Sequence, residues 1–298
     1  MENGTIIRAL SGFYDVEENG RICRCRAKGR FRLDGSSPLV GDRVEFTLSP
    51  DGAGVIRTIL PRKNSFIRPA VANIDAMVFL ASAAPPVTDP FLIDRVSVIA
   101  CRAKCEFIVV LNKCDLDRAD ALYTVCAGAG FPAVRTSVVT GEGVEALRSM
   151  LSGKVCAFTG NSGVGKSSLL NALIPELDLE IGEVSDKLGR GRHTTRHVEF
   201  YPMDDRTFIA DTPGFASFEV EMIDAIETEQ LQCCFPDFAP FLDSCRFMDC
   251  RHLKEPGCAV LQAVEDGMIA PTRHESYRRL YDMLSQRKPW EQVQPPVR

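Results

Sequence analysis

The sequence predicts a multidomain α/β protein, with an N-terminal β-barrel, a central parallel sheet flanked by helices, and a helical C-terminal region that holds a metal. Three observations lead to this fold class. Short strand-like runs separated by turn residues fill the first part of the chain. Alternating strand and helix patterns follow, and a helical pattern with clustered cysteines ends the chain. We therefore expect domains at residues 1–62, 63–220 and 221–298.

The composition is that of an ordinary globular protein, with 45% hydrophobic and 25% charged residues. No apolar run reaches membrane-spanning length, and the N-terminus lacks the regions of a signal peptide. We expect a cytoplasmic monomer with no membrane partner, whose 12 cysteines stay reduced. The net charge of −5 does not by itself suggest a nucleic-acid partner.

Five short strands in the first 62 residues suggest a small barrel of the OB type. In the run Arg21–Phe31, cations occupy every second position and small or apolar residues the positions between them. The cations are Arg24, Arg26, Lys28, Arg30 and Arg32, and the alternate set is Cys23, Cys25, Ala27, Gly29 and Phe31. On a strand the two sets face opposite ways. The cationic row favours a phosphate backbone, although a solvated face that discourages edge pairing has the same pattern.

The central region alternates apolar strands with helical patterns, which implies a parallel sheet covered by helices. The expected strands are Ile74–Ala81, Glu106–Leu111, Ala133–Ser137, Lys154–Thr159 and Thr207–Ala210. The expected helices are Asp89–Lys104, Asp117–Ala127, Val144–Leu151 and one starting near Ser168. Helices at Ala259–Val264 and Glu275–Leu284 follow, with a break at Pro271-Thr272.

The stretch from Gly160 to Ser167 reads G-x-x-x-x-G-K-S between a strand and a helix, which is the context of a phosphate-binding loop. Backbone N–H groups of such a loop and the following helix N-terminus converge on phosphate oxygens. Lys166 would reach the β- and γ-phosphates, and Ser167 would hold Mg²⁺. The expected phosphate contacts are Gly160, Asn161, Ser162, Gly163, Val164, Gly165, Lys166, Ser167 and Ser168.

Asn112-Lys113-Cys114-Asp115 directly follows an apolar strand, and N-K-x-D in that position is a guanine-reading motif. The Asp115 carboxylate can accept from two guanine N–H donors, a pair that adenine lacks. Alone, this motif is a weak signal, because it is often just a polar loop. Together with a phosphate loop in the same domain, it is a strong signal for guanine binding. Ser137 fits a supporting base contact, although Val138-Val139 after it departs from the usual S-A-K.

Asp211-Thr212-Pro213-Gly214 reads D-x-x-G, in which the carboxylate serves Mg²⁺ and the glycine N–H meets the γ-phosphate. A threonine in the basic segment before it would complete the Mg²⁺ shell, and Thr195 is favoured over Thr194. Phe215 stands where many GTPases carry a water-orienting glutamine, which phenylalanine cannot replace. His193 either orients the attacking water or only contacts nucleotide or partner.

The order of these motifs is circularly permuted, because N-K-x-D and Ser137 precede the phosphate loop instead of following D-x-x-G. The chain therefore leaves the nucleotide-binding domain just after the segment that senses the γ-phosphate. The C-terminal region that follows is expected to respond to the nucleotide state.

That C-terminal region carries Cys245, Cys250, His252 and Cys258, three thiols and one imidazole within fourteen residues. This donor set matches a closed structural zinc site with no open position for a catalytic water. Small core cysteines beside a surface histidine are the alternative. The adjacent Cys233 and Cys234 are expected to lie in the core.

The whole chain resembles the family of small-subunit-dependent GTPases called RsgA, YjeQ or YloQ. The resemblance rests on V-G-D-x-V at Val40–Val44, the permuted N-K-x-D, G-N-S-G-V-G-K-S-S-L, G-R-G-R-H-T-T, D-T-P-G-F, and the motif from Cys245 to Cys258. It implies GTP hydrolysis to GDP and phosphate with Mg²⁺, one structural Zn²⁺, and late maturation of the 30S ribosomal subunit. The 30S subunit and its rRNA would then be the partners and would stimulate hydrolysis. A metabolic phosphotransferase, or a nucleic-acid-binding module with a vestigial nucleotide site, are the alternatives.

Overall fold

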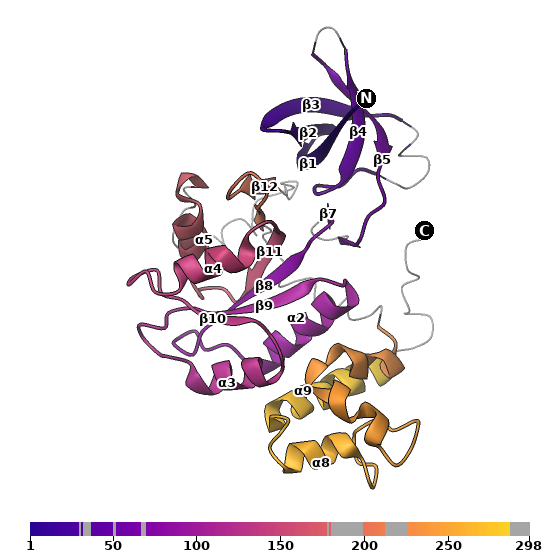
Figure 1. Cartoon of the computed structure of the whole chain (residues 1–298), viewed down its shortest axis with the longest axis vertical. Helices are drawn as coiled ribbons and strands as arrows, with labels where there is room; N and C mark the ends of the chain where they lie inside the picture. Colours follow the sequence, from indigo (N-terminus) through magenta and orange to yellow (C-terminus); the bar gives the residue numbers. More distant parts are fainter. Residues whose placement is uncertain are drawn as a thin grey trace. The chain divides into compact units, whose positions relative to one another are not determined.

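The computed structural model describes residues 1–29, 31, 37–49, 52–66, 70–177, 179, 199–211 and 226–286. The chain forms two compact units, each built from segments that are distant in sequence. The first consists of Met1–Val78, Val144–Thr159 and Lys166–Phe215, and the second of Phe79–Gly143, Gly160–Gly165 and Ala216–Arg298. Figure 1 shows the helices and strands of both.

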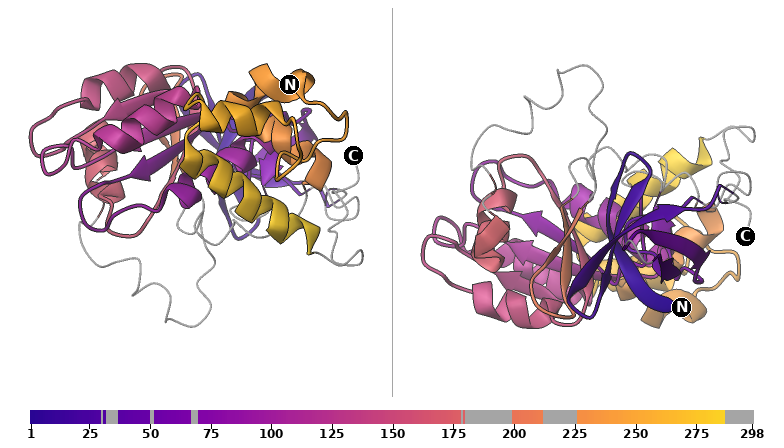
Figure 2. Two further views of the ribbon diagram at one scale, coloured as in Figure 1. Left: turned by 90° about the horizontal axis from the view of Figure 1, so that it is seen from below. Right: turned by 90° about the horizontal axis from the view of Figure 1, so that it is seen from above.

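A closed five-stranded barrel opens the first unit, as predicted. Its strands are β1 (Glu2–Leu10), β2 (Phe13–Glu18), β3 (Arg21–Ala27), β4 (Arg43–Leu48) and β5 (Gly54–Ile59). They are paired in the order β1-β2-β3-β5-β4, and β1 also pairs with β4, which closes the barrel. Only the β3–β5 pair is parallel among these pairings. Figure 2 shows these strands crossing one another steeply.

Strand β3 has the predicted two-residue alternation but is shorter than expected. Cys23 and Cys25 are buried, whereas Arg24 and Arg26 are exposed. The strand ends at Ala27 rather than Phe31, because the chain then turns and the Phe31 N–H donates to the Lys28 carbonyl at 3.2 Å. Arg30 and Arg32 lie outside the described residues.

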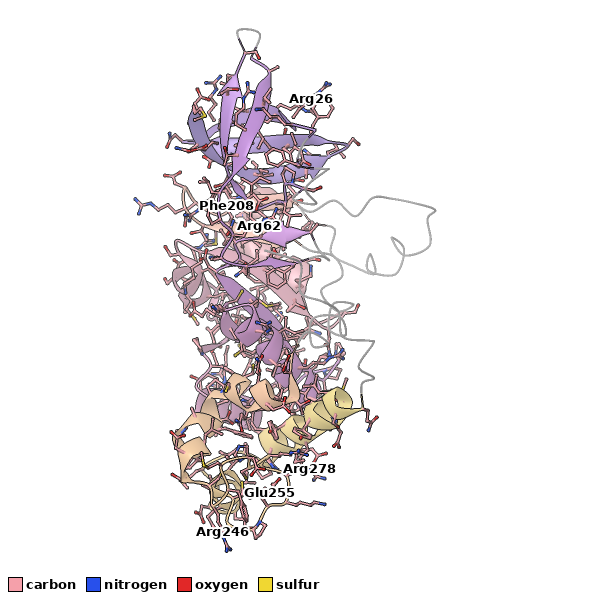
Figure 3. All side chains as sticks on the ribbon, turned by 90° about the vertical axis from the view of Figure 1, so that its right-hand side faces the viewer. Arg26, Arg62, Phe208, Arg246, Glu255 and Arg278 are labelled. Carbon is pink, nitrogen blue, oxygen red and sulfur yellow. The ribbon has the colours of Figure 1, made fainter. Side chains whose placement is uncertain are left out.

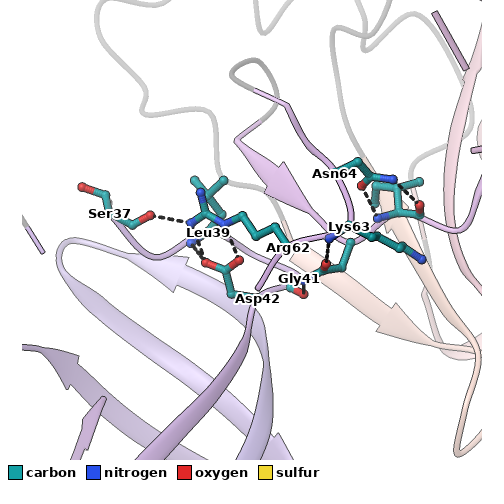
Figure 4. Close-up of polar contacts among 9 residues, drawn as sticks. Ser37, Leu39, Gly41, Asp42, Arg62, Lys63 and Asn64 are labelled. Atoms are coloured by element: carbon teal, nitrogen blue, oxygen red, sulfur yellow. Dashed lines mark hydrogen bonds and ion pairs between the residues drawn. The ribbon is translucent and has the colours of Figure 1, made fainter. Parts of the chain in front are cut away.

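A half-buried ion pair holds the chain where it leaves the barrel (Figure 4). The Asp42 carboxylate, with no exposed surface, accepts from Arg62 Nε and Nη2, both at 2.7 Å. It also accepts from the Leu39 N–H at 2.7 Å, while Arg62 Nη2 reaches the Ser37 carbonyl at 2.8 Å. Gly41 precedes it at a φ of +91°, and a Cβ there would lie 2.0 Å from the Ala72 carbonyl oxygen. The V-G-D-x-V motif therefore shapes the barrel exit.

The rest of the first unit continues the barrel into a sheet. Its elements are β6 (Ser65–Phe66), β7 (Val71–Ala72), α4 (Val144–Leu151), β11 (Val155–Gly160), α5 (Lys166–Leu173), η1 (Pro175–Leu177), β12 (Glu199–Pro202) and β13 (Phe208–Asp211). β13 pairs with β11 in parallel and with β12 antiparallel, and β12 pairs with β1. α4 packs against α5. The sequence pattern does not predict β12.

The second unit contains parallel strands β9 (Glu106–Leu111) and β10 (Ala133–Arg135), with β8 (Ala76–Ala81) running into it. Helices α2 (Pro90–Arg102) and α3 (Asp120–Gly128) precede β9 and β10 respectively. α2 begins where expected because the Asp89 carboxylate accepts from the Phe91 N–H at 2.9 Å, which caps the helix. Buried residues Ile93, Val96 and Ile99 give it an inward face.

The C-terminal part of the second unit is built from two 3₁₀ helices and two α-helices. These are η3 (Thr228–Cys234), η4 (Pro236–Ser244), α8 (Ala259–Glu265) and α9 (Pro271–Ser285). Their core is aromatic, since Phe238 and Tyr277 lie 5.0 Å apart between ring centres. α9 begins at Pro271 itself, a residue suited to the first helical turn, so the expected break lies just before it.

α9 is anchored to α2 by a buried arginine. Arg273 is 1% exposed, and its guanidinium donates to Asp237 of η4 through Nε at 3.0 Å and Nη2 at 2.7 Å. Its Nη1 donates to Asp94 of α2.

No helix among the described residues is long and apolar enough to cross a membrane.

Candidate nucleotide site and metal centre

The phosphate loop connects β11 to α5, as the motif requires. Gly160 and Gly165 have positive φ values of +153° and +94°. A Cβ at Gly160 would lie 2.5 Å from the Leu80 carbonyl oxygen, and one at Gly165 would lie 2.5 Å from Asn112 Nδ2. Glycine suits both positions, because their φ values disfavour other residues and because the Leu80 backbone and the Asn112 side chain leave no room for a Cβ. Lys166 and Ser167 then open α5, whose N-terminus favours an anion.

Asn112 ties the phosphate loop to the segment expected to read guanine. Its side chain is buried, and Nδ2 donates to the Val164 carbonyl at 2.9 Å. Its Oδ1 accepts from the Thr136 hydroxyl at 3.0 Å, and its backbone N–H donates to the Ala81 carbonyl at 2.8 Å. The first residue of N-K-x-D is therefore a structural link between β8, the phosphate loop and the end of β10.

The remaining residues of the motif lie on a turn beyond β9. Lys113 has a φ of +62°, and its ammonium donates to the Pro85 carbonyl at 2.9 Å. Asp115 is exposed, which leaves its carboxylate accessible to a base. Ser137 is fully buried after β10; its N–H donates to the Glu142 carbonyl at 3.0 Å, and its hydroxyl accepts from the Thr140 N–H at 3.2 Å.

The segments that would sense the γ-phosphate fall largely outside the described residues. The predicted site residues that lie outside them are His193, Thr194, Thr195, Gly214 and Phe215. Asp211 ends β13, and only its backbone is described. Their roles stay predictions from the sequence.

The four predicted metal ligands lie together. Cys245, Cys250, His252 and Cys258 each offer one ligand atom, and these four atoms lie within 4.8 Å of one another. His252 Nδ1 is 3.5 Å from Cys245 Sγ and 3.3 Å from Cys258 Sγ. Three of the four residues are buried. Three sulfurs and one imidazole nitrogen converging in this way fit a tetrahedral zinc ion.

Burial sets the electrostatics of this cluster. It raises the pKa of the Cys250 thiol to about 12 and lowers the pKa of His252. Burial thus disfavours both a thiolate and an imidazolium here. A divalent cation supplies the positive charge that stabilises thiolates in such a setting.

A second layer of residues orients the ligands, and the sequence pattern does not reveal it. His252 Nε2 lies 2.7 Å from Gln232 Oε1. With Nδ1 bound to a metal, Nε2 would carry the proton and donate a hydrogen bond to the amide oxygen, an arrangement common for metal-binding histidines. His274 Nε2 bonds the His252 carbonyl at 2.7 Å. No sequence spacing signals these partners, since Gln232 and His274 lie 20 and 22 positions from His252.

Glu255 shapes the ligand loop itself, at the position labelled in Figure 3. Its carboxylate accepts from the Leu253 N–H at 2.9 Å and the Lys254 N–H at 3.0 Å. Burial opposes ionisation of Glu255, but these backbone N–H groups outweigh it and hold its pKa below the usual value.

The cationic face of the barrel has an aromatic component as well. The guanidinium carbons of Arg26 and Arg24 lie 4.5 and 4.9 Å from the ring centre of Phe13 on β2. Arg26 and Phe13 are also among the residues that line a hollow of about 410 Å³. Asp15, 4.0 Å from Arg24, is an acidic neighbour supplied by β2. Stacked arginines and an aromatic ring are suited to contacting phosphates and bases.

Known proteins match the chain over nearly its full length. The RsgA GTPase family matches residues 59–221, and the RsgA N-terminal domain family matches residues 3–56. The small ribosomal subunit biogenesis GTPase RsgA of Caldanaerobacter subterraneus is 44% identical over 280 residues, which cover 93% of this chain and 94% of that protein. Its counterpart in Thermotoga maritima is 42% identical over 293 residues, covering 96% and 98%.

Solved structures agree with these relatives. The crystal structure of YjeQ from Thermotoga maritima matches with a TM-score of 0.83 and 36% identity, over 96% of this chain and 99% of that one. YloQ, a circularly permuted GTPase, matches with a TM-score of 0.80 and 35% identity, over 97% and 96%. Together with the permuted order of its motifs, these matches show that the chain belongs to the RsgA family of circularly permuted GTPases.

Proposed function

We propose that this protein is a Mg²⁺-dependent GTPase that binds the 30S ribosomal subunit late in its maturation and leaves after hydrolysis. The relatives named above are small ribosomal subunit biogenesis GTPases. The protein would act in the cytoplasm as a monomer, with a barrel at residues 1–62, a nucleotide-binding domain at 63–220 and a metal-binding domain at 221–298.

The observation that carries the proposal is the hydrogen bond of 2.9 Å from Asn112 to the Val164 carbonyl. It joins an N-K-x-D segment to a phosphate loop, so base recognition and phosphate binding belong to one site. Asn112, Lys113, Asp115 and Ser137 would read the base, and residues 160–168 would hold the phosphates.

The ion expected beside the phosphates is Mg²⁺, with Ser167, Asp211 and Thr195 as its protein ligands. A bound Mg²⁺ would neutralise charge that develops on the phosphate oxygens, and Lys166 would share that task. Phe215 offers no polar atom to a water, which supports slow hydrolysis by the protein alone. His193 or a group of the ribosomal partner would supply the missing polar contact.

Two surfaces would connect this nucleotide site to the ribosome. Arg24, Arg26 and Phe13 give the barrel a cationic and aromatic face suited to rRNA. The Cys₃His cluster would hold one structural Zn²⁺ and so shape the region that follows the D-x-x-G segment. Because that region is where the permuted chain leaves the nucleotide-binding domain, its docking would depend on the γ-phosphate.

Turnover of GTP with and without purified 30S subunits tests the proposal. We expect slow turnover alone, strong stimulation by 30S subunits, and no stimulation by an equal concentration of 50S subunits. Absence of stimulation would favour a vestigial nucleotide site on a nucleic-acid-binding protein. Competition between GTP and ATP for the free protein is the second arm, and equal binding of ATP would favour a metabolic phosphotransferase.

A further inference from the structure

A small cavity in the second unit gathers cysteines that the metal cluster does not use. It has a volume of about 280 Å³ and lies among the end of α2, the start of β9 and the 3₁₀ helices. Cys101, Cys105 and Cys234 are among its lining residues. All 12 cysteines lie within the described residues, and none forms a disulfide.

Two of these thiols reach the cavity from different elements, Cys101 from α2 and Cys234 from η3. The Cys234 thiol hydrogen-bonds to the sulfur of Cys101. In its protonated form the Cys101 thiol also donates to the Cys233 carbonyl oxygen at 3.8 Å, which places it against the chain segment that carries Cys234. Cys101 is exposed, whereas Cys234 is 6% exposed. Cys233, expected in the core from the sequence, is exposed because η3 turns it outward.

The environment makes the two thiols unequal. The hydrogen bond from Cys234, together with the Arg102 cation, lowers the pKa of Cys101 to about 7 against the opposing effect of burial. The same hydrogen bond and burial raise the pKa of Cys234 far above the usual value. At neutral pH a large share of the exposed sulfur, about half, is therefore a nucleophilic thiolate, and the buried one keeps its proton.

We propose that Cys101 and Cys234 are a redox-active pair that a peroxide oxidises to a disulfide. The Cys101 thiolate attacks one peroxide oxygen, which breaks the O–O bond, and with one proton gives a sulfenic acid and water. The Cys234 sulfur then attacks the sulfenic sulfur and releases a second water as the S–S bond forms. The two thiols are oxidised by two electrons, and the peroxide is reduced to two waters.

This pair goes beyond the nucleotide and metal sites. The bridge would join α2 to the end of η3, and η3 leads directly into the metal-binding region. In the oxidised protein the C-terminal region would be fastened to a helix of the nucleotide-binding domain. Disulfides of cytosolic proteins are mostly transient and redox-sensing, which fits a pair that stays reduced until an oxidant appears.

Peptide mapping of the full-length, metal-bearing protein tests the proposal. The protein is treated with equimolar hydrogen peroxide, blocked with iodoacetamide and digested without reductant. We expect one cross-linked peptide pair that joins Cys101 to Cys234, with the metal content unchanged. A thiol reductant should reverse it.

Single serine variants distinguish the proposed roles of Cys101 and Cys234. Cys101→Ser should prevent the bridge, and Cys234→Ser should leave a sulfenic acid on Cys101 that dimedone traps. Cys105→Ser is the matched control from the same cavity and should form the bridge at the wild-type rate. In the unmutated protein, iodoacetamide should modify Cys101 faster than Cys105 or Cys126, with a midpoint near pH 7. A bridge to Cys233 or Cys105, or oxidation of the metal ligands before Cys101, would overturn the proposal.

Discussion

At the scale of single residues, the nucleotide site depends on a buried polar side chain that bonds to both a backbone group and another side chain. Asn112 donates to Val164 in the phosphate loop and accepts from Thr136 after β10. Neither contact involves a nucleotide. The amide has both a donor and an acceptor, and each faces its complement, so no other side chain of this size satisfies both partners.

Exchanging Asn112 for aspartate tests this link. In Asn112→Asp a carboxylate oxygen would face the Val164 carbonyl, and the donor would be absent. A buried group left without its partner costs about 1–3 kcal/mol and favours a displaced phosphate loop. Because nucleotide binding must then restore the loop to its present conformation, we expect GTP and GDP affinity to fall by up to about 5- to 150-fold. Titration with a fluorescent guanine nucleotide measures the change. Asp117→Asn, an exposed exchange on the same turn, should bind as the parent does; equal reductions in both variants would remove the special role of Asn112.

In the Cys₃His cluster, Gln232 has a positioning role like that of Asn112 in the nucleotide site. Its amide oxygen fixes the orientation of the His252 ring. Gln232→Ala leaves all four ligands in place but frees the ring. We expect zinc affinity to fall about 10- to 100-fold, as for other partners of metal-binding histidines. Competition with a coloured chelator gives the affinity. The exposed Gln230→Ala on the same helix is the control, and unchanged affinity in Gln232→Ala would show that the ligand loop alone orients His252.

At the scale of elements, β3 arranges its cations so that they share one ring. Phe13 and Arg26 are paired across β2 and β3, and Arg24 lies over the same ring two residues away. Stacking on Phe13 holds the guanidinium groups in place on the strand face, which lowers the entropic cost of binding a polyanion. The strand therefore presents an ordered cationic surface.

Replacing one of these cations should change how binding depends on salt. For Arg26→Gln we expect weaker binding to rRNA fragments. The slope of log affinity against log salt should be reduced by about 0.7–0.9 for each phosphate that the variant no longer neutralises. Arg43→Gln, an exposed change of equal charge on β4, should keep the parental slope. Fluorescence anisotropy at several salt concentrations distinguishes them. Identical slopes for both variants and the parent would assign rRNA binding to another surface.

Unlike the exposed arginines of β3, Arg273 of α9 is buried and links α9 to two other elements. Arg273→Met would leave the Asp94 and Asp237 carboxylates buried without their cation, and breaking such a buried pair costs about 3–5 kcal/mol. The exposed Arg278, labelled in Figure 3, lies on the same helix. Its Nη1 is 3.6 Å from Glu275 Oε2. Arg278→Met should change the free energy of unfolding by less than about 0.5 kcal/mol. Urea unfolding followed by circular dichroism compares the two, and equal effects would show that the Arg273 pairs contribute little.

Elements with strong local signals were predictable, and those held by distant contacts were not. β9 and α4 have the expected bounds, because one is a continuous apolar run and the other a short amphipathic pattern. The 3₁₀ helix η4 has no such pattern, since Pro240 within it removes a donor. The metal ligands follow from spacing alone. The contact of Gln232 with His252 and the Arg273–Asp94 pair could not be predicted from spacing. They join residues 20 and 179 positions apart in the sequence.

At the scale of the whole molecule, a chain of contacts leads from the metal cluster to the nucleotide-binding domain. The Tyr277 hydroxyl of α9 donates to the Arg251 carbonyl at 2.9 Å, beside the ligand His252. One turn earlier on the same helix, Arg273 binds Asp94 of α2. These contacts all lie within the second unit, which also contains Asn112 and the glycines of the phosphate loop. Removal of the metal should therefore affect α2 as well as the ligand loop.

Removing the metal from the intact protein tests this coupling. After chelation, hydrogen exchange should quicken over residues 245–258, because ligand binding energy contributes to folding of such sites. It should also quicken in α9 and α2, which the Arg273 pairs connect, but stay unchanged in β1–β5 of the first unit. Returning zinc should restore protection. In Arg273→Met, chelation should affect the ligand loop without reaching α2. Unchanged exchange in α2 of the parent protein would mean that the metal supports only its own loop, and faster exchange throughout the barrel would mean that chelation unfolds the whole chain.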